Sequence, residues 1–150
     1  MKTITLTYDE AKAELDRLAA ERPDYVYRSP VEPGTCVYFD PATKVPSCIV
    51  GHVLAAKGLT RDDLLLTAPE EQQRLRDARG YDEDDVEEAT YDLNVWNRPT
   101  QLAAVGLFDA DERTRALLST AQRYQDFGRC WALAVSDAEI ETARQYPKES

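Results

Sequence analysis

The stretch Pro46-Ser47-Cys48-Ile49-Val50-Gly51-His52-Val53-Leu54-Ala55-Ala56-Lys57-Gly58 decides how the rest of the chain is arranged. It predicts a short, mostly buried helix, because its apolar residues share one compact face: Ile49, Val50, Val53 and Leu54. Ser47 is the predicted N-cap, since a serine hydroxyl accepts a hydrogen bond from an otherwise unpaired backbone N–H. Gly58 is the predicted stop.

Two spacings within this helix bear on packing and chemistry. Gly51 and Ala55 lie four residues apart, so another part of the chain can approach the helix closely. Cys48 and His52 also lie four residues apart and share a face. His52 is the only histidine, and Cys48 is one of three cysteines.

Composition indicates one globular domain spanning residues 1–150. A net charge of −10 argues against a nucleic-acid backbone or an anionic membrane as partner. No apolar run reaches the roughly 20 residues that a membrane span needs. The N-terminus lacks the pattern of a signal peptide, and an odd number of cysteines fits reduced thiols. These features predict a cytoplasmic protein.

Local patterns predict an α+β fold. Thr7 to Glu10 forms a capping box that starts a helix ending near Arg22. Residues 25–28 and 35–39 are rich in β-branched and aromatic residues and predict a β-hairpin, or part of a small antiparallel sheet, to which Thr3 to Leu6 could add a strand. Thr60 to Asp63 begins a short helix.

The second half is predicted to be mainly helical. Pro69 starts a helix that runs to about Arg79. Asp109 or Asp111 caps a helix that the Gly128 turn separates from a final helix, an αα-hairpin. The whole is therefore predicted as a hairpin or small sheet packed against about five helices, with the Cys48 helix at the centre.

One segment concentrates the negative charge. Six carboxylates fall within the seven residues 82–88 and account for −6 of the net −10: Asp82, Glu83, Asp84, Asp85, Glu87 and Glu88. A run of like charges is usually a solvated loop or helix start. The alternative is a docking surface for a basic partner. A mimic of nucleic acid would spread its carboxylates over a face, whereas these are bunched.

Two windows carry a family resemblance. The first contains Cys36-Val37-Tyr38 and Pro46 to Leu54, and the second contains Leu118 to Gln122, Gln125-Asp126, Gly128, Trp131 and Ala134. Both resemble a set of small uncharacterised proteins of actinobacterial phages and their hosts. The middle of the chain takes no part, and Cys130 departs from the group. The resemblance implies a phage or prophage accessory protein and supplies no catalytic residues.

Four residues are candidate zinc ligands: Cys36, Cys48, His52 and Cys130. Such a Cys₃His set suits structural zinc. The spacing lacks a Cys-x₂-Cys pair, however, and Cys36 and Cys130 must come from distant elements. The competing interpretation is that the cysteines are buried as small apolar side chains. No cofactor is therefore expected, with zinc as the alternative.

A cysteine-dependent enzyme is a further alternative. Cys48 at a helix N-terminus would have its thiolate favoured by the helix dipole. Its only available base is His52 on the same helix, whereas cysteine enzymes usually place the histidine on a separate element.

A third candidate site is the cluster of Gln122, Gln125, Asp126 and Trp131 around the Gly128 turn. It is either a polar recognition patch or a set of structural groups, with Asp126 capping the last helix, the glutamines satisfying backbone groups, and Trp131 filling the core.

The sequence therefore favours a non-enzymatic accessory protein that binds a host or phage macromolecule, with a protein as the expected partner.

Overall fold

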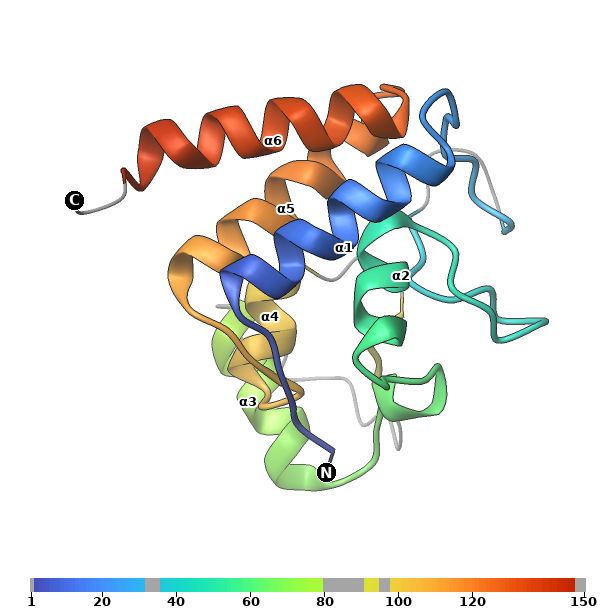
Figure 1. Ribbon diagram of the computed structural model, residues 1–150. Helices are drawn as coiled ribbons and strands as arrows, with labels where there is room; N and C mark the ends of the chain where they lie inside the picture. Colours follow the sequence, from blue (N-terminus) through green and yellow to red (C-terminus); the bar gives the residue numbers. More distant parts are fainter. Residues whose placement is uncertain (1, 32–35, 80–90, 95–97, 148–150) are drawn as a thin grey trace.

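Three long helices form the main body of the protein in the computed structural model, which describes residues 2–31, 36–79, 91–94 and 98–147. They are α1 (Tyr8–Glu21), α5 (Glu112–Asp126) and α6 (Trp131–Gln145), and each packs against the other two. Figure 1 shows α6 lying across the outer side of α1 and α5. The described chain is α+β, as expected.

The capping box predicted for α1 is confirmed. The Thr7 hydroxyl accepts from the Glu10 backbone N–H, and the Glu10 carboxylate accepts from the Thr7 N–H, both at 3.1 Å. The helix ends at Glu21 with Arg22 as its C-cap, because Pro23 follows. Its apolar face, formed by Ala11, Leu15 and Leu18, is buried.

The predicted αα-hairpin is also confirmed. Asp111, one of the two expected caps of α5, accepts from the Thr114 backbone N–H at 2.8 Å. The turn between α5 and α6 contains Gly128 at a φ of +91°, which favours glycine because it has no Cβ. Trp131 follows at the start of α6 and is fully buried.

Helix α2 (Ile49–Ala56) packs on both α1 and α5 (Figure 1). Its apolar face is fully buried, as predicted, and Gly58 follows it at a φ of +94°. Gly51 explains how closely the chain approaches this helix. A Cβ at this position would lie 1.9 Å from the Tyr38 carbonyl oxygen, so only glycine fits.

The small sheets differ from the predicted hairpin. β1 (Ile4–Thr5) pairs in parallel with β4 (Phe108–Asp109), with Ile4 opposite Phe108. β2 (Leu65–Leu66) pairs with β3 (Tyr91–Asp92) in an antiparallel sheet that contains none of the residues predicted to form the hairpin. Thr3 to Leu6 therefore does supply a strand, but its partner is β4.

The described parts of 25–28 and 35–39 form no ladder with each other. Val26 makes an isolated bridge with Cys130, and Phe39 makes one with Pro46. The reason is that Asn94 takes the backbone groups a hairpin would use. Its side chain accepts from the Phe39 N–H at 2.8 Å and donates to the Phe39 carbonyl at 2.7 Å. Its carbonyl accepts from the Tyr38 N–H at 3.2 Å.

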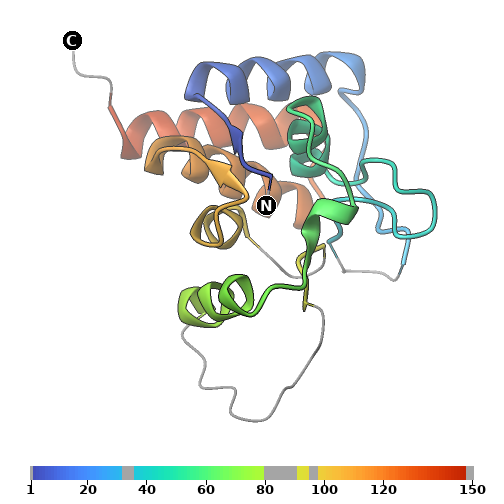
Figure 2. The ribbon, with the colours of Figure 1, turned by 90° about the horizontal axis from the view of Figure 1, so that it is seen from below.

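The remaining described elements extend the body on one side. A 3₁₀ helix (Asp62–Leu64) precedes β2, and α3 (Pro69–Arg79) matches its prediction. The segment before β4 contains α4 (Pro99–Ala104), which packs on α3 and α5. Figure 2 shows α3 on the side of the molecule away from α1 and α6. Across the described ranges, no helix combines the length and apolarity needed to cross a bilayer.

Candidate functional site

At the N-terminus of α2, the segment around Cys36 and Cys48 meets the C-terminal end of α5. Cys48, not Ser47, is the N-cap, and its sulfur accepts from the Gly51 backbone N–H at 3.4 Å. The expectation for Ser47 was wrong because its backbone N–H donates to the Tyr38 carbonyl at 2.8 Å, which holds Ser47 outside the helix. Its hydroxyl instead lies 3.3 Å from that of Tyr27.

Gln125 of α5 completes this end of α2. Its side-chain oxygen accepts from the Ile49 backbone N–H at 2.7 Å, and its amide nitrogen donates to Asp126 at 3.0 Å. Gln125 is fully buried, so it satisfies a backbone donor that water does not reach. The Gln125-Asp126 pair thus fixes α5 onto the start of α2.

Two of the cysteines also meet at this point. Cys36 is half-buried, and Cys48 is fully buried. A hydrogen bond with the Cys48 sulfur, withdrawal from water and the nearby Asp126 carboxylate together raise the pKa of Cys36 well above its usual range. Withdrawal from water also raises the pKa of Asp126. The Cys36 thiol is therefore protonated at neutral pH and is a poor nucleophile.

His52 points its ring back toward the start of its own helix. Its Nδ1 lies 2.9 Å from the Cys48 carbonyl oxygen, and because a carbonyl only accepts, Nδ1 carries the proton. Burial, and then the charges of Arg22 and Arg17, lower the pKa of His52 against the effect of that bond. The histidine is therefore neutral at physiological pH.

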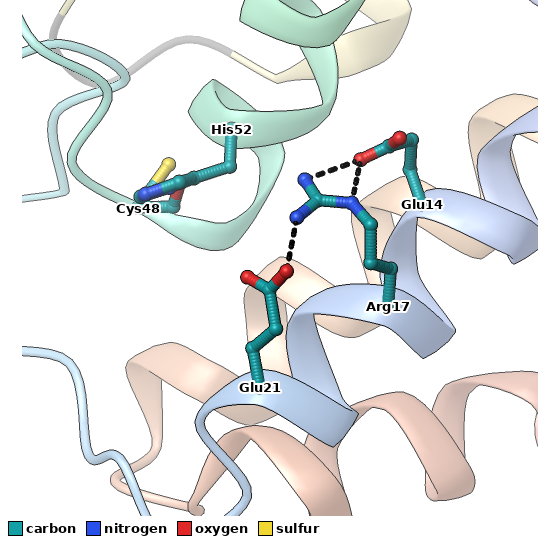
Figure 3. Close-up of polar contacts among 5 residues, drawn as sticks. All are labelled: Glu14, Arg17, Glu21, Cys48 and His52. Carbon is teal, nitrogen blue, oxygen red and sulfur yellow. Dashed lines mark hydrogen bonds and ion pairs between the residues drawn. The ribbon is translucent and has the colours of Figure 1, made fainter.

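Arg17 belongs to α1 and lies on the other side of the histidine. Figure 3 shows its guanidinium held between Glu14 and Glu21, with the His52 ring directed away from it toward Cys48. Arg17 donates to Glu14 at 2.8 Å and to Glu21 at 2.7 Å. The histidine ring also meets Trp131 edge-on, with ring centroids 5.3 Å apart. His52 is thus part of the packing between α1, α2 and α6.

This geometry does not assemble the predicted zinc ligands. In the part of the chain that the structure describes, no group of three or more His, Cys, Asp or Glu side chains is placed to hold a metal ion. His52 commits Nδ1 to a backbone carbonyl. Cys130 occupies the N-cap position of α6 without a side-chain capping bond, and its backbone bridges to Val26, so its described contacts are separate from those of Cys36 and Cys48.

The geometry also departs from a cysteine–histidine catalytic pair. Such a pair needs a base hydrogen-bonded to the sulfur and a route for substrate. The bond of His52 goes to the main-chain oxygen of Cys48, while the buried sulfur accepts from the Gly51 N–H.

The cluster around the Gly128 turn separates into different roles. Trp131 fills the core and Gln125 satisfies a backbone group, as the structural interpretation proposed, although that group belongs to α2. The expectation that Asp126 caps α6 was wrong, because Cys130 is the N-cap and Asp126 bonds to Gln125. Gln122 and Asp126 both line a surface pocket beside α4.

Several predicted residues lie outside the described residues. They form the whole acidic segment 82–88. Tyr91 begins β3, but its side chain is not among those described. No sequence signal pointed to Asn94 or Tyr27, whose polar groups join segments far apart in the chain.

The chain has no significant match among family models, curated proteins or solved structures.

Proposed function

We propose that this chain is a non-enzymatic accessory protein of a phage or prophage that acts by binding a basic host or phage protein. The observation that carries the proposal is that Cys48 and His52, the side chains best suited to catalysis, have structural roles. Cys48 caps α2 from a fully buried position, and His52 bonds to a backbone carbonyl. These residues hold the fold together in a manner typical of a structural core.

The distribution of charge supports a basic partner. Many carboxylates of the described residues are matched within the fold, including Glu10 by Lys57 at 2.5 Å and Asp92 by Arg61 at 2.6 Å. The excess of negative charge is concentrated in the segment 82–88, which holds six carboxylates in seven residues. A bunched charge of this kind speeds association with a partner of opposite sign and selects against acidic proteins.

A matched pull-down tests the proposal. One variant neutralises four carboxylates of the acidic segment, Asp84→Asn, Asp85→Asn, Glu87→Gln and Glu88→Gln. The control variant neutralises four carboxylates that form no ion pair with another described residue, Asp24→Asn, Glu70→Gln, Glu71→Gln and Asp109→Asn.

Both variants change the net charge equally, so any difference between them reports position and not total charge. We expect the wild type and the control to retain the same basic protein from a host lysate. The acidic-segment variant should lose it, and retention should fall as salt is raised. Retention of the same proteins by both variants would contradict the acidic docking surface, and retention of nothing by the wild type would contradict the binding function.

A further inference from the structure

A pocket of about 410 Å³ opens where the start of α4 faces the C-terminal half of α5. This volume lies within the range of small-molecule sites, roughly 300–1,000 Å³. Its walls combine an aromatic ring, hydroxyl and amide groups and charged side chains, among them Arg98, Ser119, Gln122, Arg123, Asp126 and Phe127. Neither Cys36 nor Cys48 lines it.

The aromatic wall is Phe127, the C-cap of α5. Its side chain is 74% exposed, the largest value among the exposed large apolar residues of the described chain. Leaving a phenyl ring in water is unfavourable, so a flat ligand that stacks on it gains from burying both faces. The ring therefore favours a planar, aromatic ligand group.

The amide wall is Gln122. Its side-chain oxygen is buried and accepts no hydrogen bond from any of the described residues. Because this oxygen has almost no surface exposed to solvent, a ligand held in the pocket would meet other atoms of the Gln122 side chain.

The charge of the pocket comes from Arg98. Its side chain is exposed and forms no ion pair within the described ranges, whereas Arg123 already donates to Glu141 at 2.9 Å and 3.0 Å. Asp126 also lines the pocket, and its carboxylate accepts from the Gln125 amide at 3.0 Å. Arg98 is thus the group available to an anion, and a guanidinium matches phosphate oxygens in geometry.

We propose that this pocket binds a nucleoside monophosphate. The base stacks on Phe127, while the phosphate accepts from Arg98. The proposal does not rest on the protein-binding function above, since it uses a different surface and a different class of ligand.

Isothermal titration calorimetry with adenosine 5′-monophosphate tests this site. Adenosine, which lacks the phosphate, and ribose 5-phosphate, which lacks the base, report the two halves of the ligand. The pocket variants are Arg98→Gln and Phe127→Ala. The matched controls are Arg144→Gln and Leu133→Ala, which remove an arginine and an exposed apolar side chain from α6, outside the pocket.

We expect saturable binding of one adenosine 5′-monophosphate per chain. Arg98→Gln and Phe127→Ala should each weaken it by roughly tenfold or more, since a charge-assisted bond or a stacked base has that magnitude. The α6 controls should bind as the wild type does. Each fragment should bind more weakly than the whole nucleotide.

Three results would overturn the proposal. The first is that the wild-type protein, shown to be folded by its thermal unfolding transition, does not bind the nucleotide saturably at millimolar concentration. The second is equal weakening by the pocket and control variants, which would indicate a diffuse electrostatic effect. The third is ribose 5-phosphate binding as tightly as the nucleotide, which would remove the role of Phe127.

Discussion

Gln125 is the side chain through which α5 holds the start of α2. Its oxygen accepts from the Ile49 N–H at 2.7 Å in a fully buried position. The first N–H groups of a helix have no partner within that helix, so a buried helix start depends on a side chain of this kind. A leucine has a similar size and lacks the acceptor.

We therefore expect Gln125→Leu to lower the free energy of unfolding by about 2 kcal/mol, the cost of leaving a buried donor unpaired. Urea unfolding followed by circular dichroism measures this change. Gln122→Leu is the matched control on the same helix, because the Gln122 side-chain oxygen has no partner among the described residues. If both variants lose the same stability, the Ile49 bond does not have the role assigned to it.

The three cysteines should differ in their rates of alkylation. Cys48 is fully buried, and the pKa of the half-buried Cys36 is raised by its bond with Cys48, by burial and by Asp126. Since the thiolate is the reactive form, Cys36 and Cys48 should label slowly with iodoacetamide at pH 7.5 in the native state. Cys130, half-buried like Cys36 but outside this cluster, should label first.

Mass spectrometry of peptides at successive times checks that order. Labelling in denaturant is the control, and there all three cysteines should react at similar rates. Fast and selective labelling of Cys48 in the native protein would favour the cysteine-enzyme alternative instead.

At the scale of elements, Gly51 sets how closely α2 approaches the strand-like segment that contains Tyr38. A Cβ there would lie 1.9 Å from the Tyr38 carbonyl oxygen. Helix propensity alone predicts that Gly51→Ala stabilises the protein by about 1 kcal/mol. The backbone clash predicts the opposite, a loss of about 3 kcal/mol, because two backbones must separate.

The sign of the change in unfolding free energy distinguishes these two effects. Ala56→Gly is the matched control, since Ala56 is exposed at the end of the same helix and should cost about 1 kcal/mol through propensity alone. A stabilising Gly51→Ala would show that the approach of Tyr38 to α2 is looser than described.

The contact between α1 and α6 contains a pair of carboxyl groups. Burial first, and then the hydrogen bond and charge of Asp16, raise the pKa of Glu139 from 4.5 to about 7, while Lys12 opposes the shift. Because the folded pKa exceeds the unfolded value, the folded state binds more protons between these two limits. The contribution of Glu139 to stability is therefore full below pH 4.5 and is lost as the pH rises through about 7.

We expect the stability of the wild type relative to Glu139→Gln to fall by about 1 kcal/mol between pH 5 and 8, after allowance for solvent screening. The comparison with the variant is needed because His52, with its lowered pKa, adds stability as the pH rises through 6.5. Glu141→Gln is the control. The pKa of Glu141 is lowered, so this carboxyl group titrates below the pH window. If the unfolding free energies of the wild type and Glu139→Gln change with pH in parallel, the raised pKa of Glu139 beside Asp16 is contradicted.

Across the whole molecule, local signals predicted the elements better than their partners. The capping box at Thr7, the stop at Gly58 and the turn at Gly128 each act through neighbouring residues, so the sequence alone places them. The pairing of β1 with β4, and the bond from Gln125 to Ile49, join residues far apart in the chain. No local pattern contains that information.

The candidate site shows the same difference between what local residues determine and what long-range contacts determine. The sequence singled out Cys48, His52 and Gln125 as chemically notable, and all three do lie at one junction. Whether such residues serve catalysis or packing depends on burial and on which atom each one bonds. Asn94 illustrates the limit, because its two bonds to Phe39 replace a hairpin that the β-propensity of residues 35–39 favours.

The arrangement of helices predicts that stability is unevenly distributed. α1, α5 and α6 pack on one another, and α2 packs on α1 and α5, whereas α3 packs mainly on α4 (Figure 2). A helix with a single main neighbour opens without disrupting the rest, because few buried contacts resist it. We therefore expect the amides of α3 to exchange with solvent at least tenfold faster than those of the second half of α5.

Hydrogen exchange followed by NMR or mass spectrometry measures this difference. Leu75, only 1% exposed, is the main apolar anchor of α3 in the described chain, so Leu75→Ala should speed exchange in α3 further. Leu118→Ala is the control, because Leu118 of α5 is fully buried in the main body and its loss should speed exchange in α1, α2, α5 and α6 together. Equal protection of α3 and α5 in the wild type would show that the two parts unfold as one cooperative unit, contrary to the packing described.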